Sequence, residues 1–331
     1  MATAEALPLP ERMQREDNCP RRVGVEIEMH GLTIDQVAGI VSSHIHGEVG
    51  QPGRYERSVS GDPAGDWQVE LDFRLLKNMG REQRPAHEFG TDILDSAEEL
   101  LKWVADSWVP VELVSPPLPM PRLGEVNVII DKLRKAGARG TADKLTYAFG
   151  MQFNPEVPDE KAETIAAYLK AFLCLYDWIS DRANVNITRR LTAYVDSFPE
   201  PYVQRVVDPC YWPAMPYLID DYLRYNPTRN RALDLLPLFR YLDEPRVLAH
   251  TQDELIKARP TFHYRLPNCL IDEPEWGIHI SWADWLQVEY LANDRERLDA
   301  CCAAYGQYLE ESLGRLLHRW VKEVEGHWLH R

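Results

Sequence analysis

A short alternating segment, VGVEIEM at residues 23–29, restricts most strongly what this chain can fold into. Alternation of apolar and polar side chains is typical of a β-strand whose two faces lie in different environments. Val25 and Ile27 would lie on one face, and Glu26 and Glu28 on the other. Strands disfavour acidic residues, and like charges on one face repel each other. The second face is therefore either exposed to water or neutralised by something positive.

Polar residues follow the same pattern in four further segments that we expect to be strands, 66–74, 110–114, 145–154 and 261–266. For any one strand, a water-exposed face is the simpler interpretation. The set as a whole, however, is rich in carboxylate and amide oxygens, which Mg²⁺ or Mn²⁺ prefers and often shares with substrate phosphates. The polar residues of these strands are Gln68, Glu70, Asp72, Glu112, Gln152, Asn154, His263 and Arg265.

Apolar residues at helical spacing alternate with these strands and dominate the second half of the chain. We expect an α+β fold in one domain, residues 21–331, with a disordered leader at 1–20 and a helical insertion at about 159–255. Thr33 is the expected N-cap of the first helix. A long C-terminal helix at about 295–325 could serve an oligomer interface. The remaining predicted helices are 33–44, 91–107, 123–137, 159–181, 214–225, 231–242 and 284–293.

The net charge of −15 argues against binding to nucleic acid or to an anionic membrane surface. No apolar run approaches the length of a membrane-spanning helix, and the first residues do not resemble a secretory signal. The six cysteines form no CxxC pair, which favours reduced thiols and a cytoplasmic location. The chain also lacks the glycine-rich motifs of P-loop and Rossmann nucleotide sites.

Five short motifs occur in a defined order: VGVEIE, WQVELDF, VELVSPPL, FGMQFN and RPTFHYRLPN. This series, together with LDLLPLF at 233–239, resembles the putative amidoligase family, which is related to glutamine synthetase and glutamate–cysteine ligase. The resemblance implies a curved, mainly antiparallel sheet that binds ATP and divalent metals, Mg²⁺ or Mn²⁺. It also implies a ligase that phosphorylates a carboxylate to an acyl phosphate, which an amine then converts to an amide. The acid would be an amino acid, a peptide or a peptide tag.

The resemblance also implies roles for individual residues. Asp72 or Glu112 could hold the amine and accept its proton, and Arg265 would contact the γ-phosphate. The implied metal ligands are Glu26, Glu28, Glu112 and His263; the implied nucleotide contacts are Gln152, Asn154, Arg259 and Arg265; and the implied catalytic residues are Asp72, Glu112 and Arg265. Gln152 and Asn154 match a polar pair that in relatives meets metal or nucleotide.

His263 departs from the family pattern. Relatives usually have a metal-binding Glu two residues before the arginine that corresponds to Arg265. A neutral imidazole can bind a metal but favours softer ions than Mg²⁺, so one metal position would be altered. Two alternatives therefore stay open: a catalytically degenerate nucleotide-binding or scaffold protein on the same fold, and a metal-dependent hydrolase. An amidotransferase or a peptidase is a candidate partner of a ligase.

Three tryptophans, Trp276, Trp282 and Trp285, allow two interpretations. They could form a wall on which a base or sugar stacks. Core packing is the better-supported interpretation, because aromatic side chains mostly fill protein cores.

Overall fold

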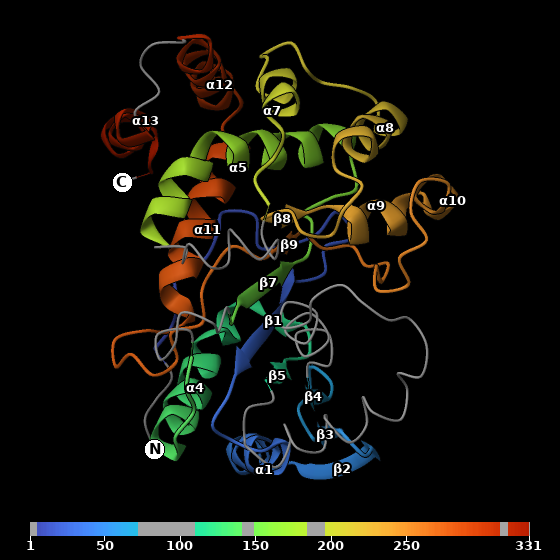
Figure 1. Cartoon of the computed structure of the whole chain (residues 1–331), viewed down its shortest axis with the longest axis vertical. Helices are drawn as coiled ribbons and strands as arrows, with labels where there is room; N and C mark the ends of the chain where they lie inside the picture. Colours follow the sequence, from blue (N-terminus) through green and yellow to red (C-terminus); the bar gives the residue numbers. More distant parts are fainter. Residues whose placement is uncertain (1–4, 72–109, 141–148, 184–195, 312–316, 331) are drawn as a thin grey trace, which may run out of the picture.

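The computed structural model of the chain contains one extended sheet with helices packed along it (Figure 1). Its strands follow the spatial order β2-β3-β4-β5-β1-β7-β9-β8, and β6 pairs with the start of β1. The pairings between these strands are antiparallel. The structure describes residues 5–71, 110–140, 149–183, 196–311 and 317–330.

The strands agree with the predicted α+β class and the mainly antiparallel sheet, whereas the glutamine synthetase type of fold stays a prediction. The residues after Leu71 that the sequence assigned to a longer strand lie outside the described ranges. The strand bounds are β1 Arg22–Met29, β2 Glu48–Gly53, β3 Glu56–Ser60, β4 Trp67–Leu71, β5 Val111–Val114, β6 Leu118–Pro119, β7 Met151–Pro155, β8 Leu233–Asp234 and β9 His263–Tyr264.

Most predicted helices agree with the structure, but the helix predicted at 231–242 begins only at Leu236, because Leu233–Asp234 forms strand β8, and α7 and α10 were not predicted. Thr33 is the N-cap of α1, and a capping box with Gln36 fixes the start of that helix. The predicted helix at 91–107 lies outside the described residues. The bounds are α1 Ile34–Ile45, α4 Gly124–Ala136, α5 Ala162–Arg182, α7 Glu200–Val206, α8 Met215–Tyr225, α9 Leu236–Leu242, α10 Glu244–Leu248, α11 Ile278–Asn293, α12 Arg295–Glu310 and α13 Leu317–Glu323, with short turns at Met120–Arg122 and Val324–Trp328.

The single helix predicted at 295–325 is wrong. Helix α12 ends at Glu310, because the next residue, Glu311, has ψ of 88° and so leaves the helical conformation. A second helix, α13, begins at Leu317. Apolar spacing continues across this interruption, which explains why the sequence pattern did not show it.

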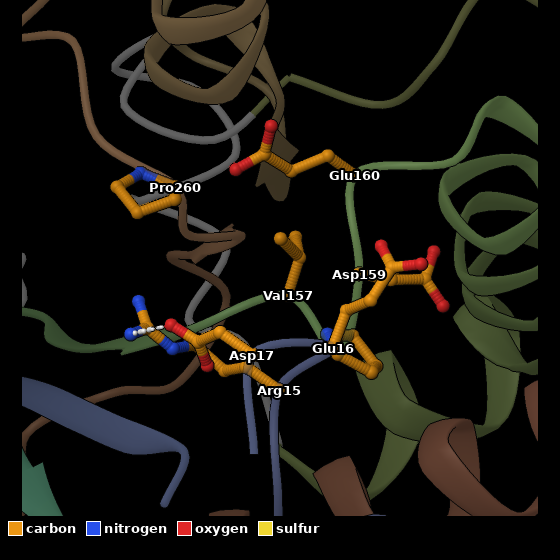
Figure 2. A pocket seen from close by; sticks show the side chains of 8 residues that line it. Arg15, Glu16, Asp17, Val157, Asp159, Glu160 and Pro260 are labelled. Atoms are coloured by element: carbon orange, nitrogen blue, oxygen red, sulfur yellow. Dashed lines mark hydrogen bonds and ion pairs between the residues drawn. The ribbon is translucent and has the colours of Figure 1, made fainter. Parts of the chain in front are cut away.

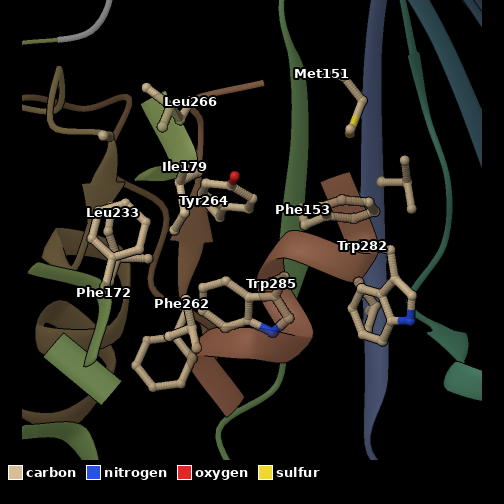
Figure 3. Packing of buried hydrophobic residues seen from close by; sticks show 14 of the residues in the cluster. Met151, Phe153, Phe172, Ile179, Leu233, Phe262, Tyr264, Leu266, Trp282 and Trp285 are labelled. Atoms are coloured by element: carbon tan, nitrogen blue, oxygen red, sulfur yellow. The ribbon is translucent and has the colours of Figure 1, made fainter. Parts of the chain in front are cut away.

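The apolar face of the sheet packs against helices and forms the core. Trp282 of α11 meets Phe153 of β7 with ring centroids 5.6 Å apart, and Trp285 lies 5.5 Å from Tyr264 of β9 (Figure 3). Both tryptophans are fully buried, as is the predicted apolar face of β1. The core interpretation of these aromatic side chains is confirmed.

Residues 5–20 differ from the expected disordered leader. They contain almost no regular structure, yet Leu7 is buried and the carbonyl of Pro8 accepts a hydrogen bond from Trp282 Nε1 at 2.8 Å. Burial of the Leu7 side chain and the hydrogen bond to the Pro8 carbonyl offset the entropy lost on ordering this segment. The N-terminal segment is thus part of the packed body.

The region 159–255 holds mainly helices, as expected of the predicted insertion, but it is not separate from the core. Helix α5 is buried along most of its length, and β8 extends the sheet by pairing with β9. Helices α8, α9 and α10 gather beyond this end of the sheet (Figure 1).

Two expectations from composition can be compared with the structure. All six cysteines are free thiols, as predicted. Within the described residues, no helix has both the length and the apolar character needed to cross a bilayer.

A fully buried ion pair fixes the start of β1. Arg21 donates to both carboxylate oxygens of Glu289 in α11, at 2.8 and 3.0 Å. Tyr168 of α5 and the indole of Trp285 also donate to Glu289, and Arg21 donates to the Glu156 carbonyl. Burial is the largest single effect on the pKa of Arg21 and lowers it, but the Glu289 charge, Tyr168 and the hydrogen bonds of this network together raise the pKa above its ordinary value. This network joins the segment before β1 to both core helices.

Removal of one partner of this pair should destabilise the protein strongly. Glu289→Ala leaves the Arg21 guanidinium buried without its counter-charge, and we expect the free energy of unfolding to fall by roughly 3–5 kcal/mol. Glu163→Ala is the matched control, because Glu163 pairs with Arg295 at the surface and such pairs contribute about 0–1 kcal/mol. Urea unfolding measures both, and similar losses in the two variants would contradict this account.

Candidate functional site

Four glutamates lie in one row across the polar face of the sheet. Glu28 of β1 is opposite Glu112 of β5, Glu112 is opposite Glu70 of β4, and Glu70 is opposite Glu56 of β3. Residues opposite each other on antiparallel strands have Cα atoms only about 4.5–5.5 Å apart. Like charges in this position are destabilising. The row is therefore a concentration of negative charge that packing alone does not explain.

Burial increases the free-energy cost of placing these carboxylates next to each other. Glu112 is 4% exposed, whereas Glu28 and Glu70 are half-buried. Taking a carboxylate out of water is unfavourable unless a partner compensates its charge. The sequence placed Glu70 on the same face as Asp72 but assigned it no role, and it did not indicate Glu56. Strand alternation could have indicated Glu70 from the sequence. That Glu56 and Glu70 lie in the row follows only from the strand pairing.

The two predicted amides connect the glutamates of β1 to the neighbouring strand β7. Asn154 Nδ2 donates to Glu26 Oε1 at 2.8 Å, and Gln152 Nε2 donates to Glu28 Oε1 at 3.2 Å. The backbone N–H of Gly150 donates to Glu28 Oε2 at 2.7 Å. These bonds fix both glutamate side chains against β7.

His263 continues this network toward the end of the sheet. Its Nε2 is 2.7 Å from Gln152 Oε1, and its Nδ1 is 3.4 Å from Oδ2 of Asp234 in β8. Burial raises the pKa of Asp234 to about 6, against the opposing effects of the Leu236 backbone N–H and of nearby arginines. Asp234 was not among the predicted site residues, although its motif, LDLLPLF, was part of the family resemblance.

Both predicted arginines lie at this end of the face. Arg259 Nη2 donates to Asn154 Oδ1 at 2.7 Å, and Arg265 donates to the carbonyl of Arg229. The two arginines therefore lie toward β8 and β9, beside the buried Asp234, and the row of glutamates extends toward β5, β4 and β3. This arrangement can attract an anionic group at one end and a cation at the other.

The structure therefore brings most predicted site residues onto one face. Asp72 is the exception, because it lies outside the described residues. The residues that share the face or contact it are Glu26, Glu28, Glu112, Gln152, Asn154, Arg259, His263 and Arg265.

Carboxylate oxygens suit Mg²⁺ or Mn²⁺ in donor chemistry. In the ranges described, however, no three His, Cys, Asp or Glu side chains converge closely enough to form a metal site. Both ring nitrogens of His263 already face Gln152 and Asp234. The donor types thus fit a hard cation best at Glu26, Glu28 and Glu112, and less well at His263.

A cavity of about 360 Å³ opens beyond the end of β7 (Figure 2). None of the predicted site residues lines it. Its walls are mainly acidic, and Arg15 forms an ion pair there with Asp17 at 2.6 Å. The lining residues are Arg15, Glu16, Asp17, Val157, Pro158, Asp159, Glu160 and Pro260.

Comparison with known proteins agrees with the motif series. The model of a protein family described as "Putative amidoligase enzyme" matches residues 19–287. This range contains every strand of the sheet. No curated protein and no solved structure matches the chain.

The raised pKa of Asp234 predicts a pH dependence of stability. The native state binds this proton more tightly than the unfolded chain does, so the contribution of Asp234 falls as pH rises from about 4 to about 6. Asp234→Asn should therefore gain stability relative to wild type over this interval, by up to about 3 kcal/mol. Urea unfolding at a series of pH values measures the difference.

Asp66→Asn is the control for this experiment, because Asp66 is exposed. Its stability relative to wild type should change little over the same pH interval. A constant difference between Asp234→Asn and wild type would show that the Asp234 proton is not bound more tightly in the folded state.

Proposed function

The chain belongs to the putative amidoligase enzyme family, whose model covers residues 19–287 of its 331, and we propose that it is an ATP-dependent carboxylate–amine ligase. The observation that carries this proposal is the charge distribution on the polar face of the sheet. A row of carboxylates that includes Glu28 and Glu112 shares this face with Arg265. Such a face suits a substrate with phosphates and a divalent cation, because the cation would lie toward the carboxylates and the phosphates toward the arginines.

In this proposal Glu26, Glu28 and Glu112 hold Mg²⁺ or Mn²⁺, and Arg259 and Arg265 face the phosphates of ATP. The metal, when bound, supplies positive charge that neutralises the phosphates. Arg265 adds a fixed positive charge where the transferred phosphoryl group carries negative charge. The remaining contribution of the protein is to position the acid and the amine.

The proposed reaction has two displacement steps. A carboxylate oxygen of the acid attacks the γ-phosphorus of ATP, ADP leaves, and an acyl phosphate forms. The amine nitrogen then attacks the acyl carbon, and inorganic phosphate leaves as the amide bond forms. The amine loses one proton in this step, and the proposed acceptor is Asp72, or Glu112 if that carboxylate does not hold the metal. An amino acid, a peptide or a peptide tag is the proposed acid.

One observation favours a second candidate, a nucleotide-binding protein of the same fold without turnover. His263 uses both ring nitrogens within the hydrogen-bond network, at 2.7 Å from Gln152 and 3.4 Å from Asp234. Binding of a metal by His263 would require one of these contacts to break. This candidate predicts stoichiometric binding of Mg-ATP and no ADP formation with any acid and amine.

Thermal unfolding tests the proposed site first. ATP with Mg²⁺ or Mn²⁺ should raise the melting temperature of the wild type, because a ligand that binds the folded state stabilises it by about 2.7 kcal/mol at 100 times its dissociation constant. Glu28→Gln should lose this rise. Glu48→Gln, the same change on the exposed edge strand β2, should retain it. No rise in the wild type with either metal would contradict the proposed site.

Turnover distinguishes the ligase from the second candidate. The wild type should release ADP and phosphate in equal amounts when a suitable acid and amine are both present. Glu28→Gln should lower kcat by about 100-fold or more, since it removes one negative charge from the proposed metal site. A Glu28→Gln variant with wild-type ligase activity would rule out this role for Glu28.

A further inference from the structure

Asn154 lies between two groups with opposite hydrogen-bonding capacity. Arg259 can only donate, and it donates to Asn154 Oδ1 at 2.7 Å. The carboxylate of Glu26 can only accept, and it accepts from Asn154 Nδ2 at 2.8 Å. The orientation of the Asn154 amide is therefore fixed by its neighbours, with its N–H groups toward Glu26 and its oxygen toward Arg259.

Gln152, two residues before Asn154 on β7, has the same arrangement. Its Nε2 donates to Glu28 at 3.2 Å, so its oxygen must accept from Nε2 of His263 at 2.7 Å. His263 in turn lies against Asp234, whose other oxygen accepts the Leu236 backbone N–H at 2.9 Å. A chain of hydrogen bonds thus runs from β8 through β9 and β7 to Glu28 on β1.

These amides have little freedom to turn away. Gln152 and Asn154 are each 7% exposed, His263 is 3% exposed, and Asp234 is fully buried. Rotation of either amide would leave buried donors and acceptors without partners, which costs about 1–3 kcal/mol for each group. A metal ligand needs an oxygen directed at the metal, but both amide oxygens are directed away from the glutamates.

We propose that Asn154 and Gln152 are positioning residues that hold Glu26 and Glu28 in place for a divalent metal and do not bind the metal themselves. Asp234 belongs to the same hydrogen-bond network, because it holds His263 against Gln152. The metal in this statement rests on the proposed function, whereas the hydrogen-bond roles do not. The proposal revises the expectation that the two amides contact the metal or the nucleotide.

Replacement of each amide by the matching acid separates the two roles. If the amide oxygens were ligands, Asn154→Asp and Gln152→Glu would bind a hard cation at least as tightly as wild type does. In our proposal these variants place a second carboxylate against Glu26 or Glu28, and Mn²⁺ affinity should fall by about 10–100-fold, as for other residues that orient metal ligands. Calorimetric titration with Mn²⁺ alone measures this.

Gln68→Glu is the matched control. Gln68 lies on the polar face of β4, is exposed, and stands opposite Val114 rather than beside Glu26 or Glu28. This variant adds the same charge to the same face without changing either chain of hydrogen bonds. Its Mn²⁺ affinity should not fall. Equal or tighter Mn²⁺ binding by Asn154→Asp and Gln152→Glu would overturn the proposal.

A double-mutant cycle tests the hydrogen bond without any metal. In the presence of a chelator, Asn154→Asp should lower the melting temperature more in wild type than in Glu26→Gln, because residue 26 can then donate to the new carboxylate. We expect the two effects to differ by at least about 3 °C. Gln68→Glu should have the same effect in both backgrounds.

The two experiments fail in distinguishable ways. Absence of Mn²⁺ binding by the wild type would overturn the proposed function, and with it the claim that these residues serve a metal. Additive effects in the double-mutant cycle would overturn the assigned hydrogen-bond role of Asn154, whatever the metal result.

Discussion

The pairing of β1 between β5 and β7 is the constraint on which the rest of the structure depends. The buried ion pair of Arg21 and Glu289 holds the start of this strand against α5 and α11. Strand alternation then directs its valines and isoleucine to the core and its two glutamates to the opposite face. A shift of one residue would exchange these faces, and the helices that bury the core make such a shift costly. The site therefore follows from the same pairing that stabilises the fold.

Charge on the polar face is organised along the sheet rather than mixed. The carboxylates of β3, β4, β5 and β1 repel each other, which reduces the stability of the protein without a ligand. Arg259 and Arg265 lie toward the other end of the sheet. Proteins keep such locally unfavourable arrangements mainly at functional sites. A ligand that carries phosphates and a divalent cation would complement both ends at once.

The buried hydrogen-bond chains explain how flexible glutamate side chains can be held on an otherwise repulsive face. Carboxylates accept only, and amides both donate and accept, so an amide can link a glutamate to an arginine or a histidine. Gln152 links Glu28 to His263 in this way, and Asn154 links Glu26 to Arg259. His263 is then part of the support for the glutamates, and the departure from the family pattern at this position becomes part of the same network.

The sequence by itself determined which residues face the core on the five predicted strands, the N-cap at Thr33, the burial of Trp282 and Trp285, and membership of the family through its motifs. These features are local, because periodicity and capping depend on neighbours in the chain. Tertiary structure alone decided that Glu56 and Glu70 join Glu112 and Glu28 in one row, and that Asp234 meets His263. It also decided that the N-terminal segment packs against α11. Strand order and register depend on contacts between residues far apart in the chain, and alternation gives the face of a residue but not its neighbour across the sheet.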